Sequence, residues 1–502
     1  MHDIVLATLN ARYIHASFGL RYLKANLKEL EAKTALLEFT IDQRPLDIAE
    51  QLLAHSPRII GLGVYIWNCT QTEEVAKLLK VLAPEVTLVL GGPEVSYEQT
   101  EQSICALADH VLSGPAEAAF YELCHNELNG LTSIEGFKVN LSLSDITLPY
   151  HLYTDEDLVN RILYVEASRG CPFKCEFCLS ALDKTAKPFA LDRFLEAMGV
   201  LYDRGARNFK FVDRTFNLSS KVSVPIMQFF LGRMAEDLFV HFEVIPDRLP
   251  DALKKMIAQF PAGSLQFEVG IQTFNPAVQT LISRKQDNDK TLENLGWLCG
   301  RSPAYIHTDL IFGLPSEALK SCADNFDKLV KIGPDEIQLG ILKRLRGMPM
   351  IRLEQPYQLR FNPNPPYEIL STSTIDFAQM QSLRRFARYW DLVGNAGRFK
   401  STLPLLLGDR PFERFMRFSE WLHATTGQTH KIGLKRLFDL LFSALSEVFN
   451  IPSEQIIETL EADYQISGSK GLPQCLVKQQ SQHNRRTKRG QNKRQLTHLL
   501  EN

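Results

Sequence analysis

The sequence predicts an α/β protein in which a doubly wound parallel sheet, a partial βα barrel and a helical domain follow one another. Short apolar runs alternate with amphipathic stretches over residues 1–130, and six further strand–helix repeats fill residues 161–345. Residues 349–466 instead show apolar residues at helical spacing. Strands that alternate with helices at this pitch are typical of parallel sheets. The chain has 502 residues, enough for about three domains of ordinary size.

The first domain should place a binding site at one edge of its sheet. Its expected elements are strands at Asp3–Leu9, Arg58–Tyr65 and Val86–Leu90 and helices at Gly19–Glu31 and Thr72–Leu82. Ligands of doubly wound sheets bind at the carboxyl ends of the strands. The loops at those ends are Asn10–Ser17, Tyr65–Asn68, Gly91–Glu94 and Ser113–Glu117.

A connector at residues 131–160 leads into the barrel. It is rich in Ser, Thr and Asp, and Pro149 interrupts any regular element there. Active sites of βα barrels lie at the carboxyl ends of the strands, so we expect the same here. The predicted barrel strands are Ile162–Ala167, Asn208–Val212, Val240–Val244, Ser264–Val269, Ile306–Ile311 and Glu336–Ile341.

Cys171, Cys175 and Cys178 cluster in the run CPFKCEFC. Three thiolates can hold a 4Fe-4S cluster and leave one iron without a protein ligand. A structural zinc loop is the alternative, but zinc sites normally close with four ligands and no fourth Cys or His is evident. The spacing, with Phe177 before the last cysteine, resembles the signature of radical S-adenosylmethionine (SAM) enzymes. The resemblance implies that SAM binds the open iron and is cleaved to a radical that abstracts hydrogen.

Polar residues end the predicted barrel strands in otherwise apolar surroundings. The runs EVGIQTFNPAVQTLISRKQ and HTDLIFGLP resemble oxygen-independent coproporphyrinogen oxidase and its relatives. This resemblance implies that Glu243 contacts the SAM amino group and Arg284 its carboxylate. Gln272 and Asp309 would lie near the ribose, and these residue types suit such partners. The predicted SAM contacts are Phe177, Asp213, Thr215, Glu243, Gln272, Arg284 and Asp309.

The loops of the first domain read YIHASFGLRYL, GLGVYIWN, LVLGGPEVS and VLSGPAEAAF, and they resemble cobalamin-binding domains fused to radical SAM enzymes. Gly91 and Gly92 lack side chains, so backbone can approach a flat macrocycle or its nucleotide tail. The first loop lacks the DxHxxG run of cobalamin mutases, so we expect no histidine on cobalt and a hydrogen-bonded loop role for His15. Other ligands of such sheets stay open, but no GxGxxG marks a dinucleotide site. The predicted cobalamin contacts are Tyr65, Trp67, Asn68, Gly91, Gly92, Glu94, Gly114 and Glu117.

The C-terminal third is expected to be helical, with helices in IDFAQMQSLRRFARYWDLVGNAGRF, at Pro411–Thr426 and at Leu434–Phe449. Apolar stripes of this kind normally form core. The segment resembles a domain of uncharacterised function, of DUF4080 type, that accompanies one subgroup of cobalamin-binding radical SAM proteins. Residues 467–502 are basic and poor in apolar residues, so we expect a disordered tail. Such a tail can bind RNA through phosphates, although no aromatic residue is interleaved for base stacking.

Composition points to an ordinary globular protein. The chain is 45% hydrophobic and 23% charged with a net charge of −2, which gives no global attraction to nucleic acid or anionic membranes. Its nine cysteines do not form a disulfide framework, and an oxygen-sensitive cluster suits the reducing cytoplasm. No run of about 18 apolar residues predicts a membrane span, and no signal peptide is evident.

Together the resemblances imply a radical SAM enzyme that uses a 4Fe-4S cluster, SAM and cobalamin. The leading hypothesis is methylation of an unactivated carbon of a small molecule or peptide, with an electron donor such as flavodoxin or ferredoxin. Rearrangement or cyclisation is an alternative, as is modification of RNA. A noncatalytic cobalamin sensor conflicts with an intact cluster motif. The sequence names no substrate.

Overall fold

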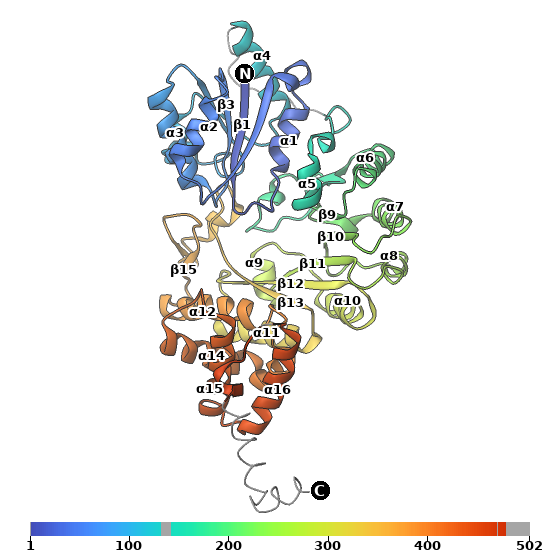
Figure 1. Cartoon of the computed structure of the whole chain (residues 1–502), viewed down its shortest axis with the longest axis vertical. Coiled ribbons are helices and arrows are strands. Elements are labelled where there is room, and N and C mark those ends of the chain that lie inside the picture. Colours follow the sequence, from blue (N-terminus) through green and yellow to red (C-terminus); the bar gives the residue numbers. More distant parts are fainter. Residues whose placement is uncertain (1, 132–141, 469, 478–502) are drawn as a thin grey trace, which may run out of the picture.

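A five-stranded parallel sheet in the order β2-β1-β3-β4-β5 forms the N-terminal domain (Figure 1). The computed structural model describes residues 2–131, 142–468 and 470–477. The strands are β1 Ile4–Asn10, β2 Thr34–Thr40, β3 Ile59–Gly63, β4 Thr87–Gly91 and β5 His110–Leu112. The helices are α1 Phe18–Ala25, α2 Pro45–Leu53, α3 Cys69–Leu82 and α4 Glu117–Asn129. Apolar side chains of α1 and α4 pack on one face of the sheet, and those of α2 and α3 pack on the other.

Four elements of this domain, β2, α2, β5 and α4, lie outside the predicted residue ranges. β2 lies at the edge of the sheet and carries Glu38 in its middle, which breaks the apolar run that marks a buried strand. The predicted helix at Gly19–Glu31 is also shorter than expected. It ends at Ala25 because Asn26 turns its side-chain amide back onto the Tyr22 carbonyl (2.8 Å).

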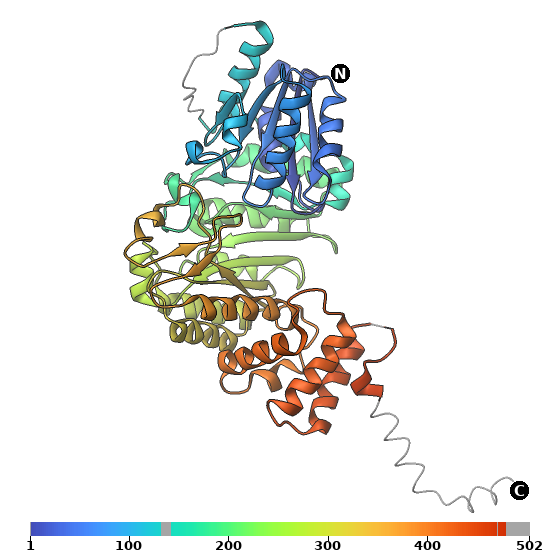
Figure 2. The same ribbon diagram turned by 90° about the vertical axis from the view of Figure 1, so that its left-hand side faces the viewer.

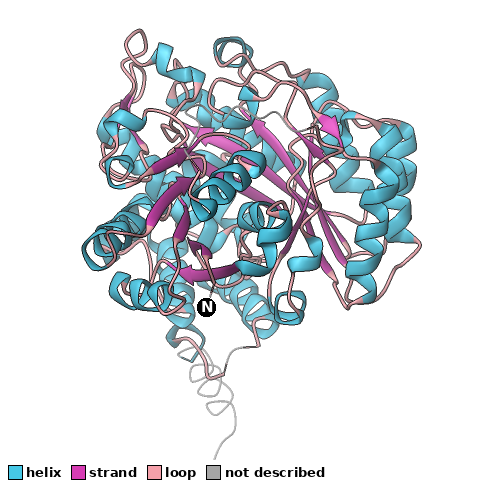
Figure 3. Cartoon of the chain, turned by 90° about the horizontal axis from the view of Figure 1, so that it is seen from above, coloured by secondary structure: helices cyan, strands magenta, loops and turns pink. Residues whose placement is uncertain are grey.

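Six parallel strands in the order β13-β12-β11-β10-β9-β6 form the second domain. β6 and β13 are its two edges, so the sheet is the predicted partial barrel. Figure 3 shows the strands from above, with helices around them. The strands are β6 Leu163–Val165, β9 Asn208–Phe211, β10 Phe239–Val244, β11 Leu265–Gln272, β12 Tyr305–Phe312 and β13 Glu336–Ile341. The helices are α6 Leu191–Asp203, α7 Ser220–Leu231, α8 Asp251–Ile257, α9 Pro276–Leu281, α10 Asn288–Arg301 and α11 Leu319–Ile332. A short antiparallel pair, β7 Ser168–Arg169 and β8 Lys187–Pro188, flanks the cysteine loop.

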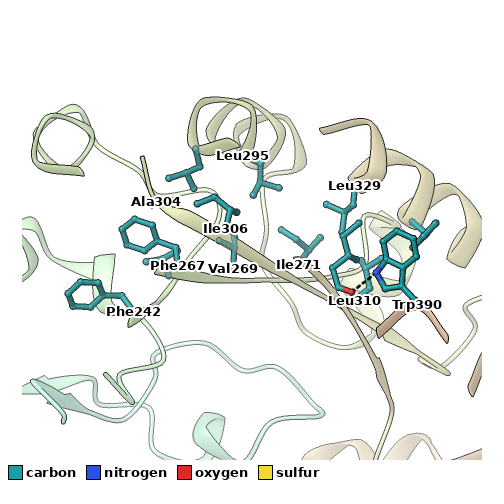
Figure 4. Close-up of a cluster of buried hydrophobic side chains, with 14 of the residues drawn as sticks. Phe242, Phe267, Val269, Ile271, Leu295, Ala304, Ile306, Leu310, Leu329 and Trp390 are labelled. Carbon is teal, nitrogen blue, oxygen red and sulfur yellow. Dashed lines mark hydrogen bonds between the residues drawn. The ribbon is translucent and has the colours of Figure 1, made fainter. Parts of the chain in front are cut away.

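Side chains alternate across these strands. Along β11, for example, Phe267, Val269 and Ile271 are buried, whereas Glu268 between them and Gln272 after them are only half-buried. The apolar set packs against the surrounding helices, as Figure 4 shows for Leu295 of α10 and Leu329 of α11. The alternate set therefore faces the inside of the barrel.

The connector holds a helix that the sequence reading excluded. α5 spans Asp155–Asn160, and Thr154 and Asp157 cap it reciprocally through each other's backbone N–H. A threonine followed three residues later by an acid is a known start signal for helices, so this element was readable from the sequence. Pro149 lies before this helix and does not interrupt it.

The C-terminal domain is helical, as predicted, but it opens with a hairpin. Figure 2 shows it at the opposite end of the barrel from the N-terminal domain. Its strands are β14 Arg360–Phe361 and β15 Ile369–Ser371. Its helices are α12 Phe377–Val393, α13 Leu403–Leu407, α14 Pro411–Thr426, α15 Leu434–Glu447 and α16 Ser453–Ile466. α12 docks on the barrel, where Trp390 donates its indole N–H to the Ile337 carbonyl of β13 (3.0 Å) (Figure 4).

Two expectations fall wholly or partly outside the described residues, namely residues 478–502 of the basic tail and residues 132–141 of the connector. Among the helices that the structure describes, none combines the length and apolar character that a membrane span requires.

Buried charges join α1 and β2 to the connector. The carboxylate of Glu38 accepts from the guanidinium groups of Arg21 and Arg161, and Arg21 also pairs with Asp157 (2.8 Å). We predict that Glu38→Gln destabilises the N-terminal domain by about 3 kcal/mol, because it leaves buried guanidinium charge with less compensation. Asp47→Asn, which breaks an exposed pair with Arg44, should leave the first calorimetric unfolding transition unchanged. Equal transition midpoints for the two variants would contradict the prediction.

Candidate functional site

The three clustered cysteines lie in the loop that follows β6 and line one cavity of about 250 Å³. Cys171 and Cys175 are buried and Cys178 is half-buried. Gly170 has a φ of +89°, and an added Cβ would overlap Asp183 and the backbone of Ala186. This glycine therefore lets the loop close on itself, where the Cys171 N–H donates to the Asp183 carbonyl (2.8 Å).

Six of the seven predicted SAM contacts line the same cavity. They are Phe177, Thr215, Glu243, Gln272, Arg284 and Asp309. The seventh, Asp213, lies outside the lining. Its carboxylate accepts from the Ala167 N–H (2.9 Å) and the Ser168 hydroxyl (2.6 Å), and burial raises its pKa to about 7. Asp213 therefore holds the start of the cysteine loop against β9 and is better described as a positioning residue.

Two arginines bring positive charge to this cavity. Nη1 of Arg214 lies 2.8 Å from both carboxylate oxygens of Glu243, and burial still raises the pKa of that carboxyl. Arg284 donates to the Gly270 carbonyl and to Gln286 (2.9 Å), and its Nη1 lies 3.9 Å from the Cys175 sulfur. Arg214 stands between the predicted contacts Asp213 and Thr215, but it was not itself among the predicted site residues.

A bulge aims Gln272 into the cavity. The pairing of β11 with β12 shifts by one residue between Gly270 and Gln272, and Gln272 adopts a left-handed φ of +68°. Bulges commonly redirect a side chain at the end of a strand, and a strained φ persists only where surrounding structure enforces it. The run EVGIQ gave no sign of this geometry beyond its glycine.

A layer of ionisable side chains inside the barrel continues from the wall of the cavity, which includes Glu268 and Asp309. His307 lies between Asp309 (3.2 Å) and Glu336 (3.3 Å), and although burial opposes it, these carboxylates raise the His307 pKa to about 10. Glu268 lies 3.1 Å from His241 and 3.5 Å from Lys210. Burial alone would raise the pKa of Glu268, but these partners lower it to about 2. This layer of side chains inside the barrel is therefore charged and only partly buried.

A second cavity of about 340 Å³ lies between the sheet and helices α1 and α4 of the N-terminal domain. Its walls are mainly apolar. Gly61 shapes it, because a Cβ there would lie 2.8 Å from Leu6 and 3.3 Å from Phe120 and would narrow the slot. Of the predicted cobalamin contacts, the lining includes Tyr65, Gly91, Gly92, Gly114 and Glu117.

The other three predicted cobalamin contacts have different surroundings. Asn68 is fully buried, and its amide donates to Thr8 and to the Leu9 and Gly63 carbonyls, so it braces the sheet. Trp67 is 45% exposed and stacks on Tyr65 with ring centroids 4.5 Å apart. Glu94 is buried against Arg346. The sequence reading missed Gly61, which its β-strand run RIIGLG could have suggested.

His15 lies on the barrel and outside the slot lining. Its Nδ1 is 2.7 Å from the Tyr164 hydroxyl, and the residue forms a bridge to Ile162 at the start of β6. Burial lowers the pKa of this imidazole. A hydrogen-bonded role of this kind is the one that the sequence reading favoured.

The residues of both cavities fit the groups that the sequence implied. Carboxylates, a guanidinium and an amide in the cysteine cavity suit the amine, carboxylate and ribose hydroxyls of SAM. The apolar slot with glycines at its rim suits the benzimidazole base of cobalamin. In the described part of the chain no three His, Cys, Asp or Glu side chains converge on a single metal-ion position. Cluster thiolates bind different irons, so they need not converge in that way.

Three family models match successive parts of the chain. They are a B12 binding domain over residues 4–124, the radical SAM superfamily over residues 165–329 and a protein of unknown function (DUF4080) over residues 355–501. The chain is a cobalamin-binding radical SAM protein. Its cofactors are accordingly a 4Fe-4S cluster, SAM and cobalamin.

Curated relatives of this radical SAM protein include methyltransferases. "Uncharacterized methyltransferase PH0819" of Pyrococcus horikoshii is 28% identical over 41% of this chain and 50% of its own length. The cobalamin-dependent radical SAM methyltransferase TokK of Streptomyces tokunonensis is 25% identical over 62% of this chain and 51% of its own length. The chain thus spans about half the length of these relatives.

Among solved structures, the radical SAM methyltransferase TsrM of Kitasatospora setae, determined with tryptophan and a SAM analogue, has a similar fold. The TM-score is 0.58 at 16% identity, and the match covers 84% of this chain and 95% of TsrM. The predicted fold class is therefore confirmed for all three parts.

Arg284 is the first test of the cysteine cavity. Arg284→Lys keeps the charge but loses the two-pronged geometry that grips a carboxylate. We expect SAM affinity to fall roughly 10- to 150-fold, the effect of losing a charge-assisted hydrogen bond, while iron content stays normal. Arg301→Lys, on α10 outside the cavity, is the matched control. Unchanged SAM affinity in Arg284→Lys would show that this guanidinium only supports the loop.

The apolar slot can be tested separately. Gly61→Leu should fill it and abolish cobalamin binding in equilibrium titrations, because the added side chain would compete with the ligand for the space beside Leu6 and Phe120. SAM affinity and iron content report whether the barrel stays intact. His15→Ala should retain cobalamin with an unchanged absorption spectrum. Loss of a nitrogen-ligand signal in His15→Ala would instead identify His15 as the cobalt ligand.

Proposed function

We propose that this protein is a cobalamin-dependent radical SAM methyltransferase that methylates an unactivated carbon of a small polar molecule. The observation that carries the proposal is that one loop lines both cavities. Glu166 and Arg169 line the apolar slot, and Cys171, two residues further on, lines the cysteine cavity. Arg169 also pairs with Glu117 of the N-terminal domain (2.7 Å), so the two cavities are held next to each other.

When bound, the cluster supplies an electron to SAM, and cobalamin carries the methyl group. The chain's own residues bind and orient. Cys171, Cys175 and Cys178 would hold the cluster, and Arg284 and Glu243 would fix the two ends of the amino-acid part of SAM. In the structure, Nη1 of Arg214 is within hydrogen-bond distance of both carboxylate oxygens of Glu243. When the amino group of SAM binds Glu243, Arg214 would therefore move away from this carboxylate or share it with SAM.

The charged side chains inside the barrel favour a polar substrate. Glu268 and Asp309 line the cysteine cavity and pair with Lys210 (3.5 Å) and His307 (3.2 Å) inside the barrel, and charges at this wall would be costly to bury against an apolar molecule. Named relatives include 2-(S-pantetheinyl)-carbapenam-3-carboxylate methyltransferase, whose substrate bears a polar carboxylate group. A small polar molecule therefore fits this interior better than a lipid does.

Cobalamin-dependent rearrangement or cyclisation is the second candidate, and it needs the same two cavities. The methyltransferase names of PH0819 and TokK favour methyl transfer. RNA modification has support only from the basic tail, most of which lies outside the described residues. An electron donor such as flavodoxin or ferredoxin completes the proposal, because the cluster must be reduced for each turnover.

We predict that anaerobically reconstituted protein binds about four irons and cleaves SAM, and that Cys171→Ala abolishes both. No nearby side chain can replace the lost thiolate. In cells, the same substitution should remove one metabolite and accumulate its precursor, which is lighter by one methylene group, as mass spectrometry would show. The matched control is Cys299→Ala, because Cys299 is a half-buried cysteine of α10 that lies outside the cavity.

The outcomes separate the alternatives. A precursor and product of equal mass would replace methyl transfer by rearrangement or cyclisation. Full SAM cleavage by Cys171→Ala would reject the cluster assignment itself.

A further inference from the structure

The segment that leaves the barrel after β13 reaches the N-terminal domain. We call residues 344–354 the strap. Nε of Arg346 lies 2.9 Å from Glu94, and its Nη1 lies 3.0 Å from Glu98. Arg344 also pairs with Glu98 (2.8 Å). The gold-coloured stretch that contains the strap lies beneath the blue N-terminal domain in Figures 1 and 2.

These two glutamates belong to the loop that borders the apolar slot, although neither is among the residues that line it. They follow Gly91 and Gly92, which line the slot, in the loop after β4. Ser96 in the same loop donates to the Gly92 carbonyl (2.8 Å) and accepts from the Gly114 N–H (3.3 Å), and Gly114 is a further lining residue. Glu94 and Glu98 therefore lie in the same loop as Ser96, which bonds two residues that line the slot.

The other end of the strap holds the cysteine loop. Arg352 grips Glu176 with two nitrogens, at 2.8 and 3.1 Å. The Met350 N–H donates to the Glu176 carbonyl (3.0 Å). Glu176 stands between Cys175 and Phe177, both of which line the SAM cavity. A stretch of eleven residues thus contacts both loops.

Packing and the C-terminal region reinforce the strap. Gly347 has a φ of +81°, and an added Cβ would overlap the ring of Tyr97, so the strap lies directly on this ring. Tyr367 lies within the region matched by the DUF4080 model. Its hydroxyl donates to Glu94 (2.9 Å) and accepts from Arg346 (3.1 Å), and its backbone carbonyl accepts from the Arg344 N–H (3.0 Å).

From these contacts we infer that the strap mechanically couples the slot loop to the cysteine loop and so sets the position of one cavity relative to the other. Arg344, Arg346 and Arg352 are positioning residues, and Glu94 serves the strap rather than cobalamin. The start of the DUF4080 region has the same task through Tyr367. The consequence for catalysis rests on the function proposed above, whereas the coupling is a property of the chain itself.

Hydrogen–deuterium exchange of the full-length protein without cofactors tests the coupling. Arg346→Met should speed exchange in residues 94–102 on the order of tenfold, because charge-assisted hydrogen bonds are lost. The decisive measurement is the exchange rate in the loop that the replaced residue does not contact. Arg346→Met should also speed exchange in residues 172–182, and Arg352→Met should do so in residues 94–102, each by roughly threefold, the size of a weak coupling energy.

Arg410→Met removes an exposed pair with Glu413 on α14 and should change neither loop. Gly347→Ala leaves every charge in place and should loosen both loops by lifting the strap from Tyr97. Unchanged exchange in α15, which none of the replaced residues belongs to, verifies that each variant is folded. If exchange changes only in the loop that the replaced residue touches, or if Gly347→Ala affects neither loop, the coupling is refuted.

With cofactors bound, Arg346→Met should consume more SAM for each methyl group transferred. A wild-type protein that transfers no methyl group would reject the proposed function and leave the exchange result to decide the coupling alone.

Discussion

The alternation of side chains along the barrel strands is the constraint on which the rest of the structure depends. On β10 and β12, apolar residues pack outward against helices, whereas His241, Glu243, His307 and Asp309 face inward. A register slip of one residue would bury these charges in the helical layer and open the core to water, so the apolar face fixes the place of the polar one. The shape of the cysteine cavity is thus a consequence of hydrophobic packing on the other side of the same sheet.

Much of the fold and part of the candidate site could be predicted, because short stretches of the sequence encode them. β13 and α14 coincide with their predicted spans, since strong periodicity and a proline at the first turn mark them. The cysteine spacing needs no tertiary information, and a family resemblance picked out Glu243, on β10, and Arg284, in the loop after α9. β2 was missed because an edge strand need not be apolar throughout, and its Glu38 is compensated by Arg21, a partner that periodicity does not reveal.

Three of the four predicted site residues outside the cavity linings have a common physical reason, whereas the fourth, Trp67, is an exposed ring stacked on Tyr65. Asn68, Asp213 and Glu94 are polar residues at strand ends, as ligand contacts are, but each satisfies its hydrogen bonds within the protein. A buried polar group must find partners, and the sequence does not say whether those partners are ligand or protein. For Glu94 the partner is Arg346, about 250 residues further on, so only the folded chain could disclose it.

Charged contacts between the domains bear on geometry more than on stability. Desolvation offsets much of the attraction in a buried pair, so Arg169 with Glu117 or Arg346 with Glu94 adds little net free energy compared with an apolar contact of the same area. An apolar interface, however, tolerates sliding, whereas a planar guanidinium accepts a carboxylate only within a narrow range of angles. Two cofactors that must act on one substrate need a fixed separation. Guanidinium–carboxylate pairs on both sides of the junction restrict the angle and distance between the two domains. We therefore infer that these pairs, and not the apolar core, set the spacing of the cofactors.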